Sequence, residues 1–247
     1  MSQLESPMNL LETQGLGVSF GGVHAVKAVD FTLQSGELRC LIGPNGAGKS
    51  TFFKMLSGQL KPTRGLCHFK GQRISGLAPH QVARLGIGIK TQAPSVFDGL
   101  DVLENLRLAA SRLQAPGEAR DTAEQTLERI GLTELRSRPV GDLAHGQRQW
   151  VELGMILASR PTLVLLDEPA AGMTYQEVRK TAALIKEINA QSTVVVVEHD
   201  MEFIRLIAGT VTVFNQGAVL AQGSFAQVTQ DPAVREAYLG KQEIKHA

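Results

Sequence analysis

One short glycine-rich stretch restricts the possible folds of this chain more than any other feature of its sequence. From Gly43 to Ser50 the residues fit the pattern G-x-x-x-x-G-K-[ST], which forms a phosphate-binding loop when it lies between a strand and a helix. The preceding residues, Leu38–Ile42, form an apolar run typical of a short buried strand. The following residues, 50–57, carry apolar side chains at helical spacing. The pattern therefore has the strand and the helix that it needs.

The chemistry of this loop follows from its backbone. Glycines have no Cβ, so successive N–H groups can converge on phosphate oxygens, and the N-terminus of the next helix favours negative charge. We expect Lys49 to reach the β- and γ-phosphates and the Ser50 hydroxyl to ligate Mg²⁺. A glycine-rich turn with an incidental lysine is the alternative, but the flanking strand and helix favour a nucleotide site. The residues predicted to hold a nucleotide here are Gly43, Pro44, Asn45, Gly46, Ala47, Gly48, Lys49, Ser50 and Thr51.

Composition narrows the class of protein further. The chain has 247 residues, of which 43% are hydrophobic and 20% charged, as in soluble globular proteins of one large or two small domains. A net charge of +1 gives no electrostatic reason to expect a nucleic-acid partner. No apolar run approaches the roughly 18 residues of a membrane span, and the first residues lack the basic start of a signal peptide. Cys40 and Cys67 lie in strand-like runs, so buried reduced thiols of a cytosolic protein are favoured, with a disulfide or metal pair left open.

Periodicity divides the chain into strand-rich and helix-rich parts. Strands are expected before the helical part at Leu16–Phe20, Val26–Leu33, Leu38–Ile42, Leu66–Phe69 and Gly86–Lys90, with a helix at Pro79–Leu85. Helices are then expected at Val102–Leu113, Glu118–Ile130 and 147–159, with Pro116 and Gly117 as a break. Apolar strands at Leu163–Leu166 and Val194–Val197 alternate with a helix at Glu177–Asn189, followed by a hairpin and two short helices opened by Ser224 and Pro232.

These signals predict an α/β fold of a single domain over residues 1–247. We expect a P-loop core with an N-terminal antiparallel β subdomain, built from about 1–92 and 161–247. We expect an inserted helical subdomain over about 93–160.

An acidic pair follows the apolar strand Leu163–Leu166. Because open α/β sheets bind ligands beyond the carboxyl ends of their strands, Asp167 is placed to hold Mg²⁺ through a water. The next residue, Glu168, is placed to polarise the attacking water as a general base. An acidic pair that only caps the next helix, with Pro169 as its first residue, is the alternative. The phosphate-binding loop makes us favour hydrolysis.

Two further polar residues follow predicted strands. His199 comes just after Val194–Val197, so the sheet would bring it to the same edge as the acidic pair, although a lone histidine is often structural. Gln92 follows the strand that ends at residue 90, and its uncharged amide can complete the Mg²⁺ sphere. The sequence thus predicts a catalytic set of Lys49, Gln92, Glu168 and His199, with Ser50, Gln92 and Asp167 as the metal ligands.

Taken together and in this order, the motifs resemble those of the ATP-binding subunits of ABC transporters, over about residues 10–240. The resemblance implies a Q-loop at Gln92, a switch histidine at His199 and an aromatic residue, Phe20, that stacks on adenine. A place in the core of its strand is the alternative for Phe20. The resemblance also implies a signature segment that binds the nucleotide of a second subunit, at Ala144, His145, Gly146 and Gln147.

The chain departs from the usual family pattern at three positions. Ala144 lacks the hydroxyl that relatives direct at the γ-phosphate of the partner's nucleotide, and His145 replaces a glycine. The amides near Gly146 remain at the start of a helix, so we expect anion binding there to be weakened rather than lost. Thr174 stands where many members have an acidic or amide residue, which puts the usual contact across the dimer in doubt.

The resemblance also implies partners and a location. It implies ATP and Mg²⁺ as cofactors, a dimer of identical or paralogous ATPase subunits, two permease subunits and, indirectly, an extracytoplasmic solute-binding protein, without nucleic acid. The subunit would lie on the cytoplasmic face of the membrane as a peripheral protein. Residues 93–100, after Gln92, would form a docking surface for permease helices.

Several segments are similar to one branch of the family, the hydrophobic amino-acid and amide uptake group. They are residues 143–150, 167–174, 197–203 and 237–240. Within that branch the chain is most similar to the urea importer ATPase, which predicts urea or short amides as the solute, with a branched-chain amino-acid importer as the alternative. A soluble non-transport ABC ATPase, a P-loop kinase or GTPase, and a nucleotide-binding module that does not hydrolyse are the remaining alternatives.

Overall fold

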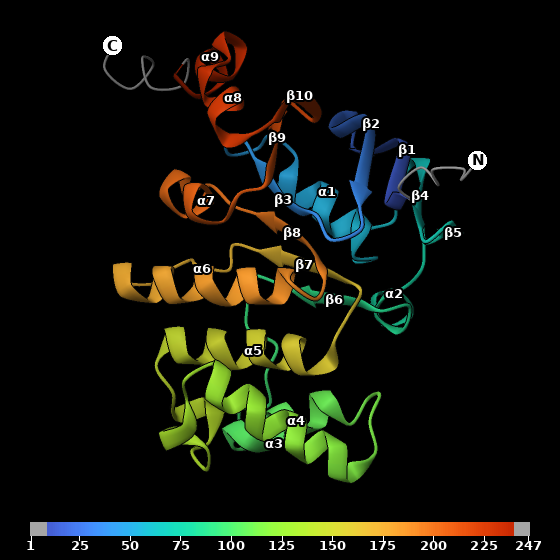
Figure 1. Cartoon of the computed structure of the whole chain (residues 1–247). Helices are drawn as coiled ribbons and strands as arrows, with labels where there is room; N and C mark the ends of the chain where they lie inside the picture. The colour runs from blue at the N-terminus through green and yellow to red at the C-terminus, as the bar shows by residue number, and fades with distance from the viewer. Residues whose placement is uncertain (1–8, 240–247) are drawn as a thin grey trace, which may run out of the picture.

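The computed structural model describes residues 9–239, so Gly240 of the last family-like segment lies outside the described residues. A six-stranded sheet with the strand order β10-β9-β3-β8-β7-β6 forms the centre of the molecule (Figure 1). Neighbouring strands in this sheet are parallel, except that β9 and β10 form an antiparallel hairpin. Its strands are β3 (Leu38–Ile42), β6 (Ile87–Lys90), β7 (Leu163–Asp167), β8 (Thr193–Val197), β9 (Thr210–Asn215) and β10 (Ala218–Gly223).

A second sheet is antiparallel, with the strand order β2-β1-β4-β5. Its strands are β1 (Asn9–Phe20), β2 (Val23–Gln34), β4 (Arg64–Phe69) and β5 (Gln72–Arg73). Helix α1 (Lys49–Leu56) follows β3 and packs between the two sheets. Its Phe52 ring lies 5.5 Å from the Phe31 ring of β2 and 5.2 Å from the Phe214 ring of β9, measured between centroids. The helix that begins at the phosphate-binding loop is therefore held by aromatic contacts on both sides.

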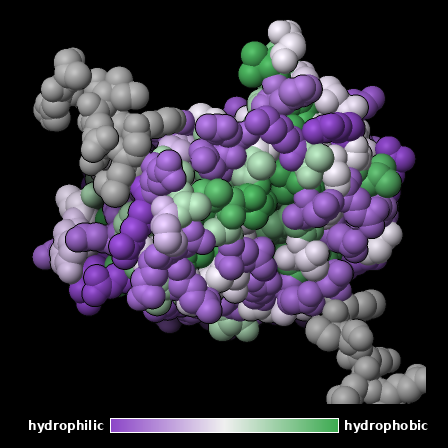
Figure 2. All heavy atoms as spheres, turned by 90° about the horizontal axis from the view of Figure 1, so that it is seen from above, coloured by the Kyte–Doolittle hydropathy of each residue, from purple (hydrophilic) through white to green (hydrophobic). Residues whose placement is uncertain are grey.

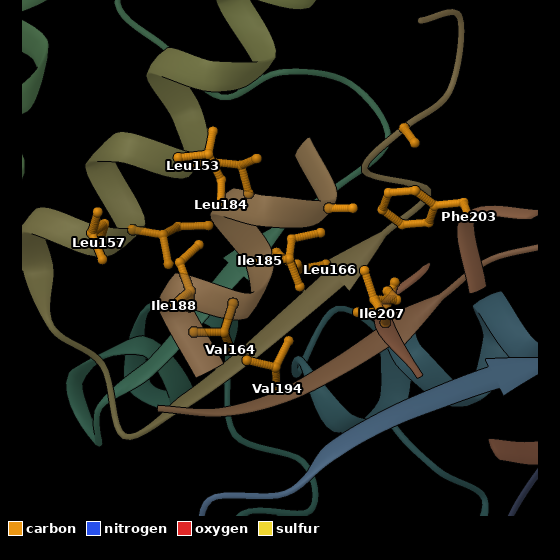
Figure 3. Packing of buried hydrophobic residues seen from close by; sticks show 14 of the residues in the cluster. Leu153, Leu157, Val164, Leu166, Leu184, Ile185, Ile188, Val194, Phe203 and Ile207 are labelled. Atoms are coloured by element: carbon orange, nitrogen blue, oxygen red, sulfur yellow. The ribbon is translucent and has the colours of Figure 1, made fainter. Parts of the chain in front are cut away.

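Helix α6 (Tyr175–Asn189) covers the opposite face of the central sheet. Figure 3 shows Leu184, Ile185 and Ile188 of α6 between Leu153 and Leu157 of α5 (His145–Ser159) and the side chains of β7 and β8. Helix α7 (Met201–Ile207) adds apolar residues to the same cluster. The fully buried, wholly apolar strands need cover on both faces, and α1 and α6 supply it.

Two further helices form a layer beyond α6 and α5, at the bottom of Figure 1. Helix α3 (Val102–Ala110) and helix α4 (Pro116–Arg129) pack against each other and against α5. Shorter helices are α2 (Pro79–Arg84), α8 (Phe225–Gln230), α9 (Pro232–Leu239) and two single-turn segments at Thr133–Leu135 and Val140–Asp142. Residues 93–160 are thus mostly helical and lie on one side of the sheet.

The α/β fold with an antiparallel sheet and a helical region agrees with the sequence prediction, whereas several boundaries differ by a few residues. Two of these differences have a clear physical reason. Pro116 does not interrupt a helix but occupies the first turn of α4, where its missing N–H has no helical partner to lose. Strand β1 begins at Asn9 rather than at the predicted Leu16. The apolar pattern did not reveal the first part of this strand because polar residues such as Glu12 and Gln14 interrupt it. Gly15 in β1 has a φ of 56°, which marks an irregularity in its pairing with β2.

The polar surface and the two buried cysteine thiols are those of a protein with a buried hydrophobic core. Figure 2 shows mostly hydrophilic side chains around a central hydrophobic area on the face seen from above. Within residues 9–239, no helix combines the length and the apolar character that a membrane crossing requires. Cys40 and Cys67 are buried free thiols, which excludes the disulfide that the sequence left open, and burial raises the pKa of each to about 12.

Candidate active site

Four chain segments meet at one edge of the central sheet because four neighbouring strands are parallel. The strands β3, β8, β7 and β6 all end at this edge. The segments at their ends are the phosphate-binding loop, Glu198–Asp200, the acidic pair formed by the last residue of β7 and Glu168, and the stretch that contains Gln92. Residues far apart in sequence are therefore neighbours in space.

The phosphate-binding loop needs glycine at two positions. At Gly43, where φ is 148°, a Cβ would lie 2.2 Å from the Phe214 carbonyl oxygen. At Gly48, where φ is 102°, a Cβ would lie 2.6 Å from the Ala25 carbonyl oxygen. A side chain at either position would meet backbone that cannot move aside, so the loop packs closely against β9 and β2. Its other side opens into a hollow lined by residues 45–51 and Glu168.

Lys49 and Ser50 begin the helix behind this loop. The Lys49 ammonium donates to the carbonyl oxygens of Gly43 at 2.6 Å and Pro44 at 3.1 Å. Its side chain is therefore folded over the loop that it is predicted to serve, with an exposed fraction of 7%. Ser50 is exposed on the hollow. Both residues line the hollow, and they would contact the phosphate oxygens of a nucleotide bound there.

The Glu168 carboxylate joins two other predicted site residues. One oxygen accepts a hydrogen bond of 2.7 Å from the Gln92 side-chain amide, and the other lies 3.3 Å from His199 Nδ1. The Glu168 backbone has a φ of 47°, in the left-handed region that a residue other than glycine seldom adopts. Its N–H donates to the Val197 carbonyl oxygen at 2.9 Å, which ties this unusual turn to β8. Such a conformation persists only where the surrounding structure fixes it, and such positions concentrate at functional sites.

Asp167 ends β7 directly beside this cluster and is 9% exposed. Burial raises the pKa of its carboxyl, and so does the neighbouring Glu168, whereas Lys54, Lys90 and Lys49 act in the opposite direction. One of its oxygens is buried without a hydrogen-bond partner among the described residues. A buried carboxylate oxygen without a partner suits a hard cation with oxygen ligands.

A magnesium ion fits these residues only together with other ligands. Among residues 9–239, no group of three or more His, Cys, Asp or Glu side chains could hold a metal by itself. The Asp167 carboxylate, the Ser50 hydroxyl and the Gln92 amide would therefore share Mg²⁺ with phosphate oxygens and water, as is usual for this ion. Its chemistry there would be to neutralise charge on the phosphates.

The predicted signature segment lies outside this hollow, at the start of α5. Ala144 precedes the helix, and its N–H donates to the Gln147 side-chain oxygen at 3.1 Å. Gly146 is buried, and a Cβ there would lie 2.2 Å from a carboxylate oxygen of Glu177. The exposed His145 ring has its Nε2 3.1 Å from the Ala171 carbonyl oxygen, in the turn after Glu168. The histidine that replaces the family's glycine thus links the signature segment to that turn within one chain.

Thr174 and Phe20 each resolve one question from the sequence. Thr174 caps α6: its N–H and its hydroxyl both donate to Glu177 at 2.8 Å, so its side chain is engaged in its own chain. Phe20, at the end of β1, is 51% exposed, so the core alternative is wrong for this residue. Its stacking on adenine stays a prediction.

The sequence did not point to three buried charges near the site. Lys90, at the end of β6, is fully buried 3.5 Å from Glu152 of α5, and Glu152 also accepts the Ser95 N–H at 2.9 Å. Burial lowers the pKa of Lys90 and raises that of Glu152. The third is Glu198, 2% exposed. Lys90 ends one apolar strand, Glu198 directly follows another, and Glu152 lies in an amphipathic helix. A charged residue at a position where the apolar pattern predicts a buried side chain is the signal that could have identified all three.

Comparison with known proteins identifies the class to which this fold and site belong. The family described as "ABC transporter" matches residues 26–171, which include the phosphate-binding loop and the acidic pair. A second family, described as "Branched-chain amino acid ATP-binding cassette transporter", matches residues 218–244. The solved ATP-binding cassette MJ1267, in its ADP conformation, is 28% identical with a TM-score of 0.83, covering 94% of this chain and 99% of that one. The central sheet, the antiparallel sheet and the helical region are therefore those of a P-loop ATPase of the ABC type.

Two relatives match over nearly their whole length. The high-affinity branched-chain amino acid transport ATP-binding proteins BraF of Pseudomonas aeruginosa and LivG of Escherichia coli K12 are each 37% identical over 250 residues. The match covers 94% of this chain and 98% of each relative. The chain belongs to the ABC transporter family as an ATP-binding subunit of the branched-chain amino acid type, and it is an ATPase. Kinases, GTPases and non-hydrolysing modules are thereby set aside.

Proposed function

We propose that this subunit hydrolyses ATP to drive an ABC importer for branched-chain amino acids. The observation that carries the proposal is the 37% identity with BraF and LivG over 94% of this chain, both of which are named for that transport. The C-terminal match at residues 218–244 supports it independently of the ATPase motifs. Urea, the solute predicted from the resemblance within that branch, has no such support in these names.

We propose the following roles at the site. Lys49 and the loop amides bind the β- and γ-phosphates, while Ser50, Gln92 and Asp167 hold Mg²⁺. Glu168 accepts a proton from the water that attacks the γ-phosphorus, and the bond to the β–γ bridging oxygen breaks. In support, the Glu168 carboxylate lies on the hollow and is oriented by both Gln92 and His199.

We further propose that two such subunits, identical or paralogous, enclose the nucleotides between them. The signature residues Ala144, His145, Gly146 and Gln147 lie outside the hollow of their own chain. A partner could therefore present them to the γ-phosphate, through the amides at the start of α5. ATP would then bind the closed pair better than the open one, and hydrolysis would remove that difference.

The permease would bind beside the Gln92 segment, on the cytoplasmic face of the membrane. A groove there runs between α2, β6, α3 and α5 and includes Ser95, Leu108 and Glu152. Phe97 is 55% exposed and Leu108 43%, so apolar side chains are available to a permease helix. Because Gln92 starts the same segment, movement of that helix would reach Glu168.

Reconstitution tests the solute. The subunit, its permease and its solute-binding protein are placed in liposomes, and ATP-driven uptake of labelled leucine and of labelled urea is measured in parallel. We expect uptake of leucine, and loss of that uptake with the Glu168→Gln subunit. Uptake of urea without leucine would replace the proposed solute, and no ATP-dependent uptake of either would refute the importer.

A further inference from the structure

A buried carboxylate lies directly behind the candidate site. Side chains alternate along a strand, so Glu198 continues the face of β8 that carries Val194 and Val196, toward α6 and α7 rather than toward the nucleotide hollow. Its own N–H donates to the Leu41 carbonyl oxygen of β3 at 3.2 Å, which extends the sheet by one residue. An apolar residue would suit this position, yet the chain has a glutamate with an exposed fraction of 2%.

Three backbone amides converge on this carboxylate. One oxygen accepts the N–H groups of His199 at 3.0 Å and Asp200 at 3.3 Å, and the other accepts the N–H of Ala170 at 3.4 Å. Ala170 belongs to the turn after Glu168, whereas His199 and Asp200 belong to the turn after β8. The side chain therefore bridges the two turns whose first residues face each other at 3.3 Å, between Glu168 and His199 Nδ1.

The arrangement costs free energy that packing alone would not require. Burial raises the pKa of Glu198, and the three N–H bonds oppose that rise. A buried carboxylate is unfavourable unless such bonds compensate it, and a valine would avoid the penalty. The three hydrogen bonds are to backbone amides, so they fix the path of the two turns. The same carboxylate also lies 3.9 Å from His199 Nδ1.

We propose that Glu198 is a positioning residue for ATP hydrolysis, which holds the His199 turn against the Glu168 turn. It does not line the nucleotide hollow, and it acts by fixing the backbone from which the His199 ring reaches Glu168. The proposal rests on the roles proposed above for these two residues. Without the carboxylate, the amides of His199 and Asp200 lose their acceptor and the His199 ring loses its fixed distance from Glu168.

A double-mutant cycle with His199 tests this role. ATP turnover, KM for ATP and ATP affinity are measured for the full-length wild type, Glu198→Gln, His199→Ala and the double variant. The glutamine keeps the size of the side chain but has one acceptor oxygen, and its NH₂ group faces an N–H. We expect kcat to fall about 10- to 100-fold in Glu198→Gln, as for a misplaced catalytic group, with ATP affinity and KM within about twofold. In the His199→Ala background the same change should alter kcat by less than about twofold.

A matched control separates positioning from stability. Asp231→Asn alters another carboxylate that accepts backbone N–H groups, those of Ala233 and Val234 at the start of α9, and should leave kcat unchanged. Glu198→Gln should lose activity even at temperatures well below its unfolding midpoint.

Two results would overturn the inference while leaving the proposed function intact. They are an unchanged kcat in Glu198→Gln, and an equal loss of kcat with and without His199. Wild-type turnover in His199→Ala would instead remove the proposed role of His199 and the inference with it.

Discussion

At the scale of single residues, the site is organised around one carboxylate. Glu168 takes a left-handed backbone conformation, accepts a hydrogen bond from Gln92 and faces His199. Its neighbour Asp167 is more deeply buried and has an oxygen left for a cation. Two adjacent acidic residues thus have different surroundings, which suits one of them for the metal and the other for proton transfer.

Glu168→Gln should separate binding from chemistry. The amide keeps the shape of the side chain and a hydrogen-bonding partner for Gln92, but it cannot accept a proton. We expect turnover to fall at least about 100-fold while ATP affinity stays close to that of the wild type. Steady-state hydrolysis and calorimetric titration with ATP measure the two quantities. Glu128→Gln, on the exposed face of α4, is the control; wild-type turnover in Glu168→Gln would exclude the proposed role.

Lys49→Ala should instead weaken nucleotide binding. The ammonium lies over the phosphate-binding loop, so its removal takes away the positive charge nearest the predicted β- and γ-phosphates. We expect ATP affinity to fall at least about tenfold, which is close to the lower limit of what a hydrogen bond to a charged group contributes. Titration with ATP checks this, with the exposed Lys61→Ala as control. Equal affinities of wild type and Lys49→Ala would contradict the assignment.

At the scale of elements, the two helices that follow the Glu168 and His199 turns, α6 and α7, each begin at a side-chain cap. Asp200 accepts the N–H groups of Glu202 and Phe203 at the start of α7, directly after His199. Thr174 and Glu177 cap α6 reciprocally. The parallel strands bring the turns to one edge, and the caps determine where each turn ends.

The cap of α3 gives a test that is independent of the chemistry. The Asp101 carboxylate accepts the Glu104 N–H at 2.7 Å. Asp101→Ala leaves that amide without its partner, and we expect it to lower the free energy of unfolding by about 1 kcal/mol. Asp101→Asn keeps an acceptor and should lose much less. Urea unfolding of the two variants measures the difference, and equal stability of the alanine variant and the wild type would show that the cap contributes nothing.

At the scale of the whole molecule, α1 joins the two sheets while α6 joins the central sheet to the helical layer. The hydrophobic cluster around α1 contains Cys67 of β4. The hydrophobic cluster around α6 contains Cys40 of β3. Both thiols therefore report on the integrity of the packed layers, one on each side of the central sheet.

Thiol labelling follows from this arrangement. Burial raises the pKa of both thiols to about 12, so almost no thiolate is present at pH 8, and neither sulfur is accessible. We expect a thiol reagent at pH 8 to leave the native protein unlabelled and to modify both cysteines in denaturant. Mass spectrometry after timed labelling counts the products. Rapid labelling of either cysteine in the native protein would show that its layer opens.

Much of this fold was accessible from the sequence because its signals are local. The glycine pattern, the apolar strands and the caps act within a few residues, so the order of strands and helices could be predicted. The extra start of β1 and the role of Pro116 could not, because a polar strand segment and a proline are each compatible with more than one structure. The functions assigned to the site residues remain predictions, whether they are argued from the sequence or from the structure.

The amino-acid order alone was enough to predict a phosphate-binding loop between a strand and a helix, and polar residues after three further strands. The meeting of Gln92 and His199 at the Glu168 carboxylate, and the bonds of Glu198 to the amides of two separate turns, became visible only in the folded molecule. The physical reason is that strand order and pairing depend on packing between distant segments, whereas loops and caps depend on neighbours along the chain.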